Sequence, residues 1–194
     1  FGSLLWWMTR IKKEVKENLS EYRYNHCLRV MEEASSLAKH YHASESEILK
    51  CELCGLTHDL CKELSPLENE KIIKEYNLPK ELLLKENKNI VHGFIASVIV
   101  KEKYNFTDNM VLAIRYHTTG YPNMDLLGKI VYLADKIEKG KNYPGILEER
   151  DLAYKNIDKA IILCLKNQIK NLKEKNKTIN PKAYETLHYL QEEV

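Results

Sequence analysis

The chain has 194 residues, of which 44% are hydrophobic and 30% are charged, and its formal net charge at pH 7 is +2. These values exclude a disordered chain, and they give no case for a DNA- or RNA-binding surface, which would need a strongly basic balance. They predict one domain of ordinary to large size. They do not exclude an anionic small substrate, which local lysines rather than net charge would hold.

The cysteines and the apolar runs indicate the cellular compartment of the protein. Its five cysteines are odd in number and the chain is not a small disulfide scaffold, so we predict free thiols and a cytoplasmic protein. No apolar run approaches the roughly 20 residues that span a bilayer, and no membrane partner is expected. The pair Cys51 and Cys54 lacks a second C-x-x-C, so we do not interpret it as a zinc or redox site.

Residues 1–8 are interpreted as an N-terminal extension. The stretch before Met8 is apolar, but it is too short for a signal peptide and has no basic lead. We predict that Met8 is the natural start and that residues 1–7 derive from cloning. Residues 9–194 are then predicted to form a single domain.

Apolar residues recur at helical spacing along nearly the whole chain, so the sequence predicts an all-α fold. Ser20, Ser44 and Ser65 have the character of helix N-caps, and Glu47 would complete a capping box with Ser44. From 146 to about 175 we expect one long helix or a broken one. The remaining expected helices cover 10–18, 20 to about 40, 44 to about 59, 66–76, 80–86, 92 to the lysine-glutamate tail at 101–103, 107–117, 124–138 and 181–193.

His58 and Asp59 lie side by side in the apolar segment Leu56-Thr57-His58-Asp59-Leu60. A carboxylate in such a setting must be paired or must bind a metal. Adjacent helical positions point about 100° apart, so both side chains reach one ion only near a helix end. Mixed histidine and carboxylate ligands suit hydrolytic metals, and a carboxylate can bridge two cations.

Four further residues could complete a metal site: His26, His92, His117 and Asp135. Each has an ordinary alternative taken alone, such as a pairing of His26 with a nearby glutamate, or of Asp135 with Lys136. All four lie at predicted helix ends or on otherwise apolar faces, and this coincidence favours a metal site. The other histidines, His40, His42 and His188, are interpreted as surface or core residues.

The pattern His26, His58-Asp59, Asp135 resembles the H…HD…D signature of the HD-domain phosphohydrolase superfamily, and His92 and His117 add the pattern of its dinuclear members. Longer segments resemble the YqeK family of bacterial symmetrical diadenosine tetraphosphate hydrolases, and the similarity covers about residues 9–193. These segments are Tyr22-Arg23-Tyr24-Asn25-His26, Ala113-Ile114-Arg115-Tyr116-His117-Thr118-Thr119-Gly120, Tyr132-Leu133-Ala134-Asp135-Lys136-Ile137-Glu138 and Asn142-Tyr143-Pro144-Gly145.

The resemblance implies a single-domain helical HD fold and cleavage of diadenosine tetraphosphate into two ADP by a hydroxide between two metals. The metals are usually described as iron, with manganese, cobalt or zinc as alternatives. One metal would take His26, His58, Asp59 and Asp135, and the other would take His92 and His117, with Asp59 as the bridge. Asp59 and Lys62 would be catalytic.

The resemblance also implies substrate contacts, which are carried over to Arg23, Tyr24, Asn25, Lys62, Thr118, Lys141, Tyr143, Thr178, Ile179 and Asn180. Three positions depart from the family pattern. Lys139 stands where a proline is usual, Lys141 stands where an arginine is usual, and Tyr121 replaces a common basic residue. Because lysine offers a point charge rather than a fork of donors, these departures concern phosphate affinity more than reaction class.

Three alternatives stay open at this point. The same fold could act on another nucleotide, such as a deoxynucleoside triphosphate or a cyclic dinucleotide. It could be a non-catalytic HD binding module, although none of the six candidate ligands is missing. A plain helical interaction protein is the third. A homodimer is left open.

Overall fold

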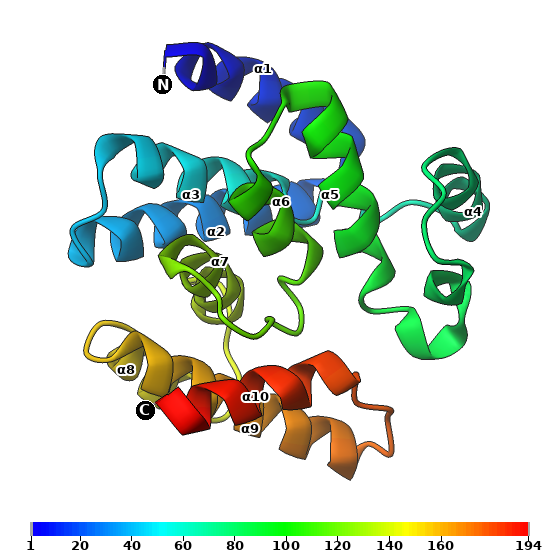
Figure 1. The fold of residues 1–194 in the computed structure, drawn as a ribbon. Helices are drawn as coiled ribbons and strands as arrows, with labels where there is room; N and C mark the ends of the chain where they lie inside the picture. The colour runs from blue at the N-terminus through cyan, green and yellow to red at the C-terminus, as the bar shows by residue number, and fades with distance from the viewer. Residues whose placement is uncertain (1, 194) are drawn as a thin grey trace.

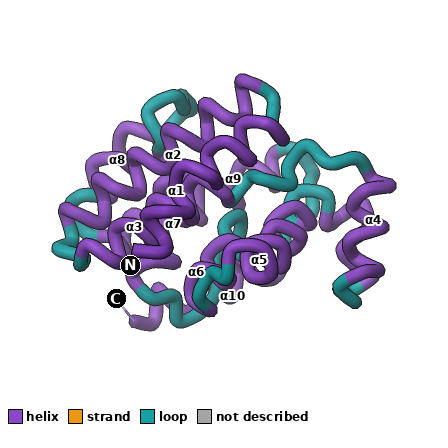
Figure 2. The backbone as a smooth tube through the Cα atoms, turned by 90° about the horizontal axis from the view of Figure 1, so that it is seen from above, coloured by secondary structure: helices purple, strands orange, loops and turns teal. Residues whose placement is uncertain are grey.

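The computed structural model describes residues 2–193, and no strand occurs among them, which confirms the predicted all-α fold (Figures 1 and 2). The predicted extension includes Phe1, which lies outside the described residues. The elements are α1 (Gly2–Asn18), α2 (Glu21–His40), α3 (Glu45–Thr57), α4 (Pro66–Glu75), η1 (Lys80–Leu83), η2 (Lys85–Asn87), α5 (Val91–Tyr104), α6 (Asp108–Arg115), α7 (Leu126–Ile137), α8 (Ile146–Ala153), α9 (Ile157–Glu174) and α10 (Pro181–Glu193).

The three predicted N-caps form as the sequence indicates. The hydroxyl of Ser20 accepts from the N–H of Arg23 at 3.2 Å, and that of Ser65 accepts from the N–H of Glu68 at the same distance. Ser44 and Glu47 complete a reciprocal capping box at the start of α3. These caps satisfy N–H groups that a helix leaves unpaired, so they determine where α2, α3 and α4 begin.

Two elements differ from the expectation, and a third takes one of its two expected forms. The first helix begins at Gly2, well before residue 10, and residues 80–87 form two 3₁₀ turns instead of one short helix. The segment 146–175 is broken into α8 and α9. The side chain of Asn156 accepts from the N–H of Lys159 at 3.1 Å and thereby caps the second of them.

Helix α7 runs through the middle of the molecule (Figure 1). The paired helices α2 and α3 pack on it together with α6, while α8 and α9 pack against it on the side where α10 also lies (Figure 1). Leu37, Leu53, Ile114 and Leu133 are fully buried in the core between these helices. Helix α4 lies at one edge in both views (Figures 1 and 2).

Helices α2 and α3 approach each other closely at Gly55. A Cβ atom at this position would lie 3.0 Å from the Cα and backbone N of Met31. A larger residue would therefore require the two backbones to move apart, and the close approach brings the start of α2 near the end of α3.

Between residues 2 and 193, no helix is both long enough and apolar enough to cross a membrane.

Candidate metal centre

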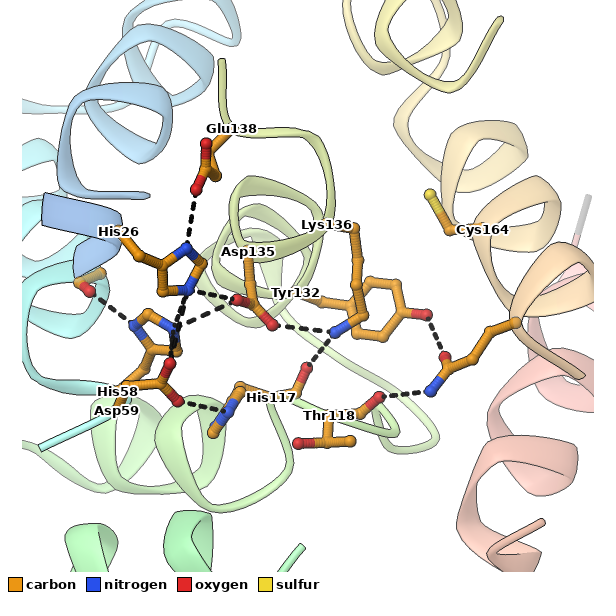
Figure 3. A network of polar contacts seen from close by, with 12 residues as sticks. His26, His58, Asp59, His117, Thr118, Tyr132, Asp135, Lys136, Glu138 and Cys164 are labelled. Carbon is orange, nitrogen blue, oxygen red and sulfur yellow. Dashed lines mark hydrogen bonds and ion pairs between the residues drawn. The ribbon is translucent and has the colours of Figure 1, made fainter. Parts of the chain in front are cut away.

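Five separate helices or helix ends, α7 among them, bring the six predicted ligands together. Figure 3 shows five of these ligands, all except His92. All six are buried except Asp135, whose side chain is 13% exposed. The contributors are α2 with His26, the end of α3 with His58 and Asp59, the start of α5 with His92, the end of α6 with His117, and the last turn of α7 with Asp135.

The end of α3 places two neighbouring side chains on the same centre. His58 is the C-cap of this helix, and Asp59 follows in a turn where the backbone leaves the helical path. Adjacent side chains within a regular helix point about 100° apart, so His58 and Asp59 can face the same centre only because the helix ends here.

One group of atoms, called cluster one here, consists of His26 Nε2, His58 Nε2, Asp135 Oδ1 and Asp59 Oδ2. The two histidine nitrogens lie 3.2 Å apart, and they lie 3.1 and 3.2 Å from Asp135 Oδ1. Each also lies 3.4 Å from Asp59 Oδ2. Four potential ligand atoms thus face one another.

A second group, called cluster two, consists of His92 Nε2, His117 Nε2 and Asp59 Oδ1. The two nitrogens lie 3.1 Å apart, and Asp59 Oδ1 lies 3.2 Å from His92 and 3.5 Å from His117. Asp59 therefore turns one carboxylate oxygen toward each cluster, which is the arrangement of a bridging ligand.

The spacing and the histidine tautomers both fit metal ions. Ligand bonds of roughly 2.0–2.2 Å place neighbouring ligand atoms about 3.0–3.5 Å apart. His58 Nδ1 lies 2.7 Å from the carbonyl oxygen of Gly55, and His117 Nδ1 lies 2.7 Å from that of Ile114. A carbonyl only accepts, so Nδ1 must donate, and in the neutral ring Nε2 presents a lone pair to its cluster.

The electrostatics of the two clusters differ. Burial alone would lower the pKa of His58, but the carboxylates of Asp59 and Asp135 outweigh it and raise that pKa to about 10. In cluster two, burial lowers the pKa of His92 to about 4 and also lowers that of His117. Cluster one therefore attracts positive charge strongly, whereas cluster two presents neutral imidazoles.

Three cationic side chains surround the centre. Arg23 Nη1 lies 3.1 Å from Asp59 Oδ2, and its Nε is buried without a hydrogen-bond partner. The ammonium of Lys136 lies 3.0 Å from Asp135 Oδ2 and 3.1 Å from the carbonyl oxygen of His117. Lys62 follows Asp59 by one turn and is half-buried, and burial lowers its pKa.

A cleft of about 600 Å³ opens beyond Lys136, between the loop after α7 and helix α9. Its lining includes Lys141 and Tyr143, two of the predicted substrate contacts. The hydroxyl of Tyr143 lies 2.7 Å from Glu149 Oε1 and 2.9 Å from the carbonyl oxygen of Lys136, so it is held inside the protein. The other lining residues are Pro144, Glu149, Cys164, Asn167, Gln168, Lys170, Asn171, Glu174 and Lys175.

The remaining predicted substrate residues do not line this cleft. Thr118 is next to it, since its carbonyl oxygen accepts from Gln168 Nε2 at 3.5 Å. Tyr24 is half-buried and Asn25 is exposed, beside His26 on α2. Residues 178–180 lie in the loop between α9 and α10.

Glu138 and Lys136 were not predicted as site residues, although both contact the centre. Glu138 is buried and lies 2.7 Å from His26 Nδ1. The sequence signal that could have indicated Glu138 is its spacing from Asp135. Residue 138 follows Asp135 by three positions, which places it near the same face at the end of the helix. A charged residue at the buried end of an apolar helix is the pattern to look for.

Comparisons with known proteins identify the family of this chain. The HD domain family matches residues 23–140, a span that contains all six candidate ligands. A Staphylococcus aureus protein named "Bis(5'-nucleosyl)-tetraphosphatase, symmetrical" is 37% identical over 183 residues, which is 93% of this chain and 92% of that one. A Halalkalibacterium halodurans protein of the same name is 39% identical over 177 residues, 91% and 92% of the two chains.

A solved structure extends the likeness to three dimensions. It is described as a "predicted HD superfamily hydrolase involved in NAD metabolism" from Clostridium acetobutylicum, and it superposes with a TM-score of 0.87 at 31% identity. The match covers 96% of this chain and 97% of that one. The chain therefore belongs to the HD-domain family and, within it, to the family of bacterial symmetrical bis(5'-nucleosyl)-tetraphosphatases.

Proposed function

We propose that this protein is a metal-dependent phosphohydrolase that cleaves diadenosine tetraphosphate symmetrically into two ADP. The observation that carries the proposal is the position of Asp59, whose two oxygens face two separate groups of ligand atoms. A site for two metals held by histidines and carboxylates is the arrangement that phosphoryl hydrolysis uses. The relatives named as symmetrical tetraphosphatases supply the substrate.

In this proposal, cluster one and cluster two each hold one cation, and iron is the expected metal. Manganese, cobalt and zinc also accept mixed imidazole and carboxylate ligands, so they are the alternatives. Bound cations would supply Lewis acidity, which activates water at neutral pH and offsets negative charge on the phosphoryl group.

The chain's own cations would hold the tetraphosphate. Arg23 has an unpaired buried N–H beside Asp59, and a phosphate oxygen would satisfy it. Lys136 connects the centre to the cleft, where Lys141, Lys170 and Lys175 would attract the rest of the phosphate chain. Lys62 would be a further phosphate contact. Thr118 and Tyr143 would lie near a nucleoside, as would Tyr24, Asn25, Thr178, Ile179 and Asn180.

The second candidate is the same chemistry on another nucleotide. Lysines in the cleft recognise phosphate rather than base, and the matching solved structure is described as involved in NAD metabolism. A different phosphoanhydride substrate would therefore suit the same centre.

Product analysis tests the proposal. The protein is purified anaerobically, its metal content is measured, and diadenosine tetraphosphate, deoxynucleoside triphosphates and a cyclic dinucleotide are offered separately. We expect about two metal ions per chain and ADP as the single product of the first substrate. ATP with AMP as the main products of diadenosine tetraphosphate would contradict symmetrical cleavage. Tripolyphosphate from a deoxynucleoside triphosphate, or a linear dinucleotide from the cyclic one, with diadenosine tetraphosphate left intact, would contradict the proposed substrate.

A further inference from the structure

Glu138 lies behind His26, on the side away from the ligand cluster (Figure 3). It is 1% exposed, and its Oε2 accepts the Nδ1–H of His26 at 2.7 Å. The Nε2 atom of the same ring faces His58 and Asp135 in cluster one. The carboxylate, the imidazole and the cluster therefore lie in series.

This support differs from that of two other ligand histidines. His58 and His117 donate their Nδ1–H to neutral backbone carbonyls, whereas His26 donates to an ionised carboxylate. The pKa of Glu138 is lowered, because the Arg29 guanidinium and His26 outweigh the effect of burial. A carboxylate in this place fixes the ring tautomer and increases the basicity of Nε2 as a ligand.

Glu138 is itself held from three sides. Arg29 Nε donates to its Oε1 at 2.9 Å, and the N–H of Gly140 donates to the same oxygen. Arg150 donates to the carbonyl oxygens of Ile137 at 2.8 Å and of Glu138 at 2.7 Å. These bonds fix both the backbone and the carboxylate at the end of α7.

We propose that Glu138 is a positioning residue that sets the metal affinity of cluster one through His26. The inference rests on the proposed function, since it assumes that cluster one holds a metal. It assigns a role to a residue outside the six candidate ligands.

The test titrates Co²⁺ into the metal-free full chain by calorimetry and compares the parental protein with Glu138→Gln. Glutamine keeps the shape but places an N–H₂ group against either His26 or the donors Arg29 and Gly140. We expect one of two binding steps to weaken by about 10- to 100-fold, the range that outer partners of metal ligands show. An unchanged isotherm would overturn the proposal.

The matched control is Glu33→Gln. Like Glu138, Glu33 is a buried carboxylate, and it lies on α2 two turns after His26. Its side chain accepts from the hydroxyl of Tyr154 at 2.5 Å rather than from a candidate ligand. Its Co²⁺ isotherm should stay within about twofold of the parental one. An equal weakening in both variants would make the effect a general consequence of removing a buried charge, and would overturn the assignment.

A second variant covers the case in which Glu138→Gln does not fold. Arg29→Met removes a charged partner of Glu138 from a position whose side chain is 34% exposed, and should weaken the same step by a smaller factor. A lower melting temperature of the metal-free protein with unchanged affinity would indicate a structural role only. A parental protein that binds Co²⁺ but makes no ADP would refute the proposed function and leave this inference standing.

Discussion

Asp59 is the residue on which both clusters depend, because its two oxygens complete one cluster each. Asp59→Ala should therefore lose both metals and at least about 10³-fold in kcat/KM, which is about 4 kcal/mol of transition-state stabilisation. Metal analysis and an ADP assay on the same preparation check this.

The control is His188→Ala. Its side chain is 76% exposed and contacts only Glu192, at 3.0 Å, among the ion pairs of residues 2–193. A surface pair of this kind contributes about 0–1 kcal/mol to stability and nothing to the centre. An Asp59→Ala protein that made ADP as fast as its parent would refute the metal assignment.

His58 leads to a prediction about protons. Its folded-state pKa is raised from 6.5 to about 10, so its contribution to the stability of the metal-free protein is complete below pH 6.5 and is lost as pH rises through 10. A metal must displace that proton. At pH 7.5, filling cluster one should release protons, because the pKa of His58 is about 10 and that of His26 is also raised by Asp135 and Asp59 against the effect of burial. Filling cluster two should release none, because the pKa of His92 is about 4 and that of His117 is lowered.

Calorimetric titrations in buffers of different ionisation enthalpy measure the released protons directly. The apparent affinity of cluster one should also rise between pH 6.5 and 9. Equal proton release in the two steps would show that the clusters do not differ in this way.

The six candidate ligands could be predicted from sequence because histidines and aspartates on apolar helical faces are few and conspicuous. Glu138 could not be assigned in the same way. Its role depends on a contact between the end of α7 and a residue 112 positions earlier in the chain. Spacing along one helix does not show which side chain of another helix will lie opposite.

At the scale of elements, helices α2 and α3 approach each other closely at Gly55. This approach helps to hold His26 Nε2 and His58 Nε2 3.2 Å apart. Gly55→Ala would push a Cβ atom against the backbone of Met31. We expect a loss of about 1–3 kcal/mol in the free energy of unfolding, typical of overpacking, together with weaker Co²⁺ binding. Urea denaturation of the metal-free protein measures the first effect.

Ser46→Ala serves as the comparison, because residue 46 lies in the first turn of the same helix, away from Gly55. It should change stability by less than about 0.5 kcal/mol, as ordinary surface substitutions do. If Gly55→Ala were equally mild, the two helices would have room to separate, and the close approach would not control the centre.

The starts of α2, α3 and α4 were predictable because their signals are local caps. The break between α8 and α9 was left open, since helical periodicity continues across it. The structure shows long-range contacts there: His40 Nε2 donates to the carbonyl oxygen of Tyr154 at 2.7 Å, and the Tyr41 hydroxyl donates to that of Ala153 at 2.5 Å. Side chains at the end of α2 thus occupy the last carbonyls of α8.

In the whole molecule, the metal centre and the cleft come from different parts of the chain. The six candidate ligands lie between residues 26 and 135, inside the span that the HD domain family matches. The cleft begins at Lys136, and most of its lining comes from α8, α9 and the loop before them. The first part would therefore determine the reaction, and the second would determine which phosphate compound reaches it.

The last prediction concerns this division. Lys170 is exposed at the cleft, four residues after Lys166, which is exposed on the same helix but does not line the cleft. Lys170→Ala should raise KM for diadenosine tetraphosphate several-fold, which corresponds to a loss of about 0.5–1 kcal/mol in the free energy of substrate binding. It should leave kcat within about twofold. The difference should shrink as salt is added, because exposed charges are screened. Lys166→Ala should change neither constant, although it removes the same charge from a chain of net charge +2. A similar rise in KM for both variants would mean that overall charge, rather than the cleft, attracts the substrate.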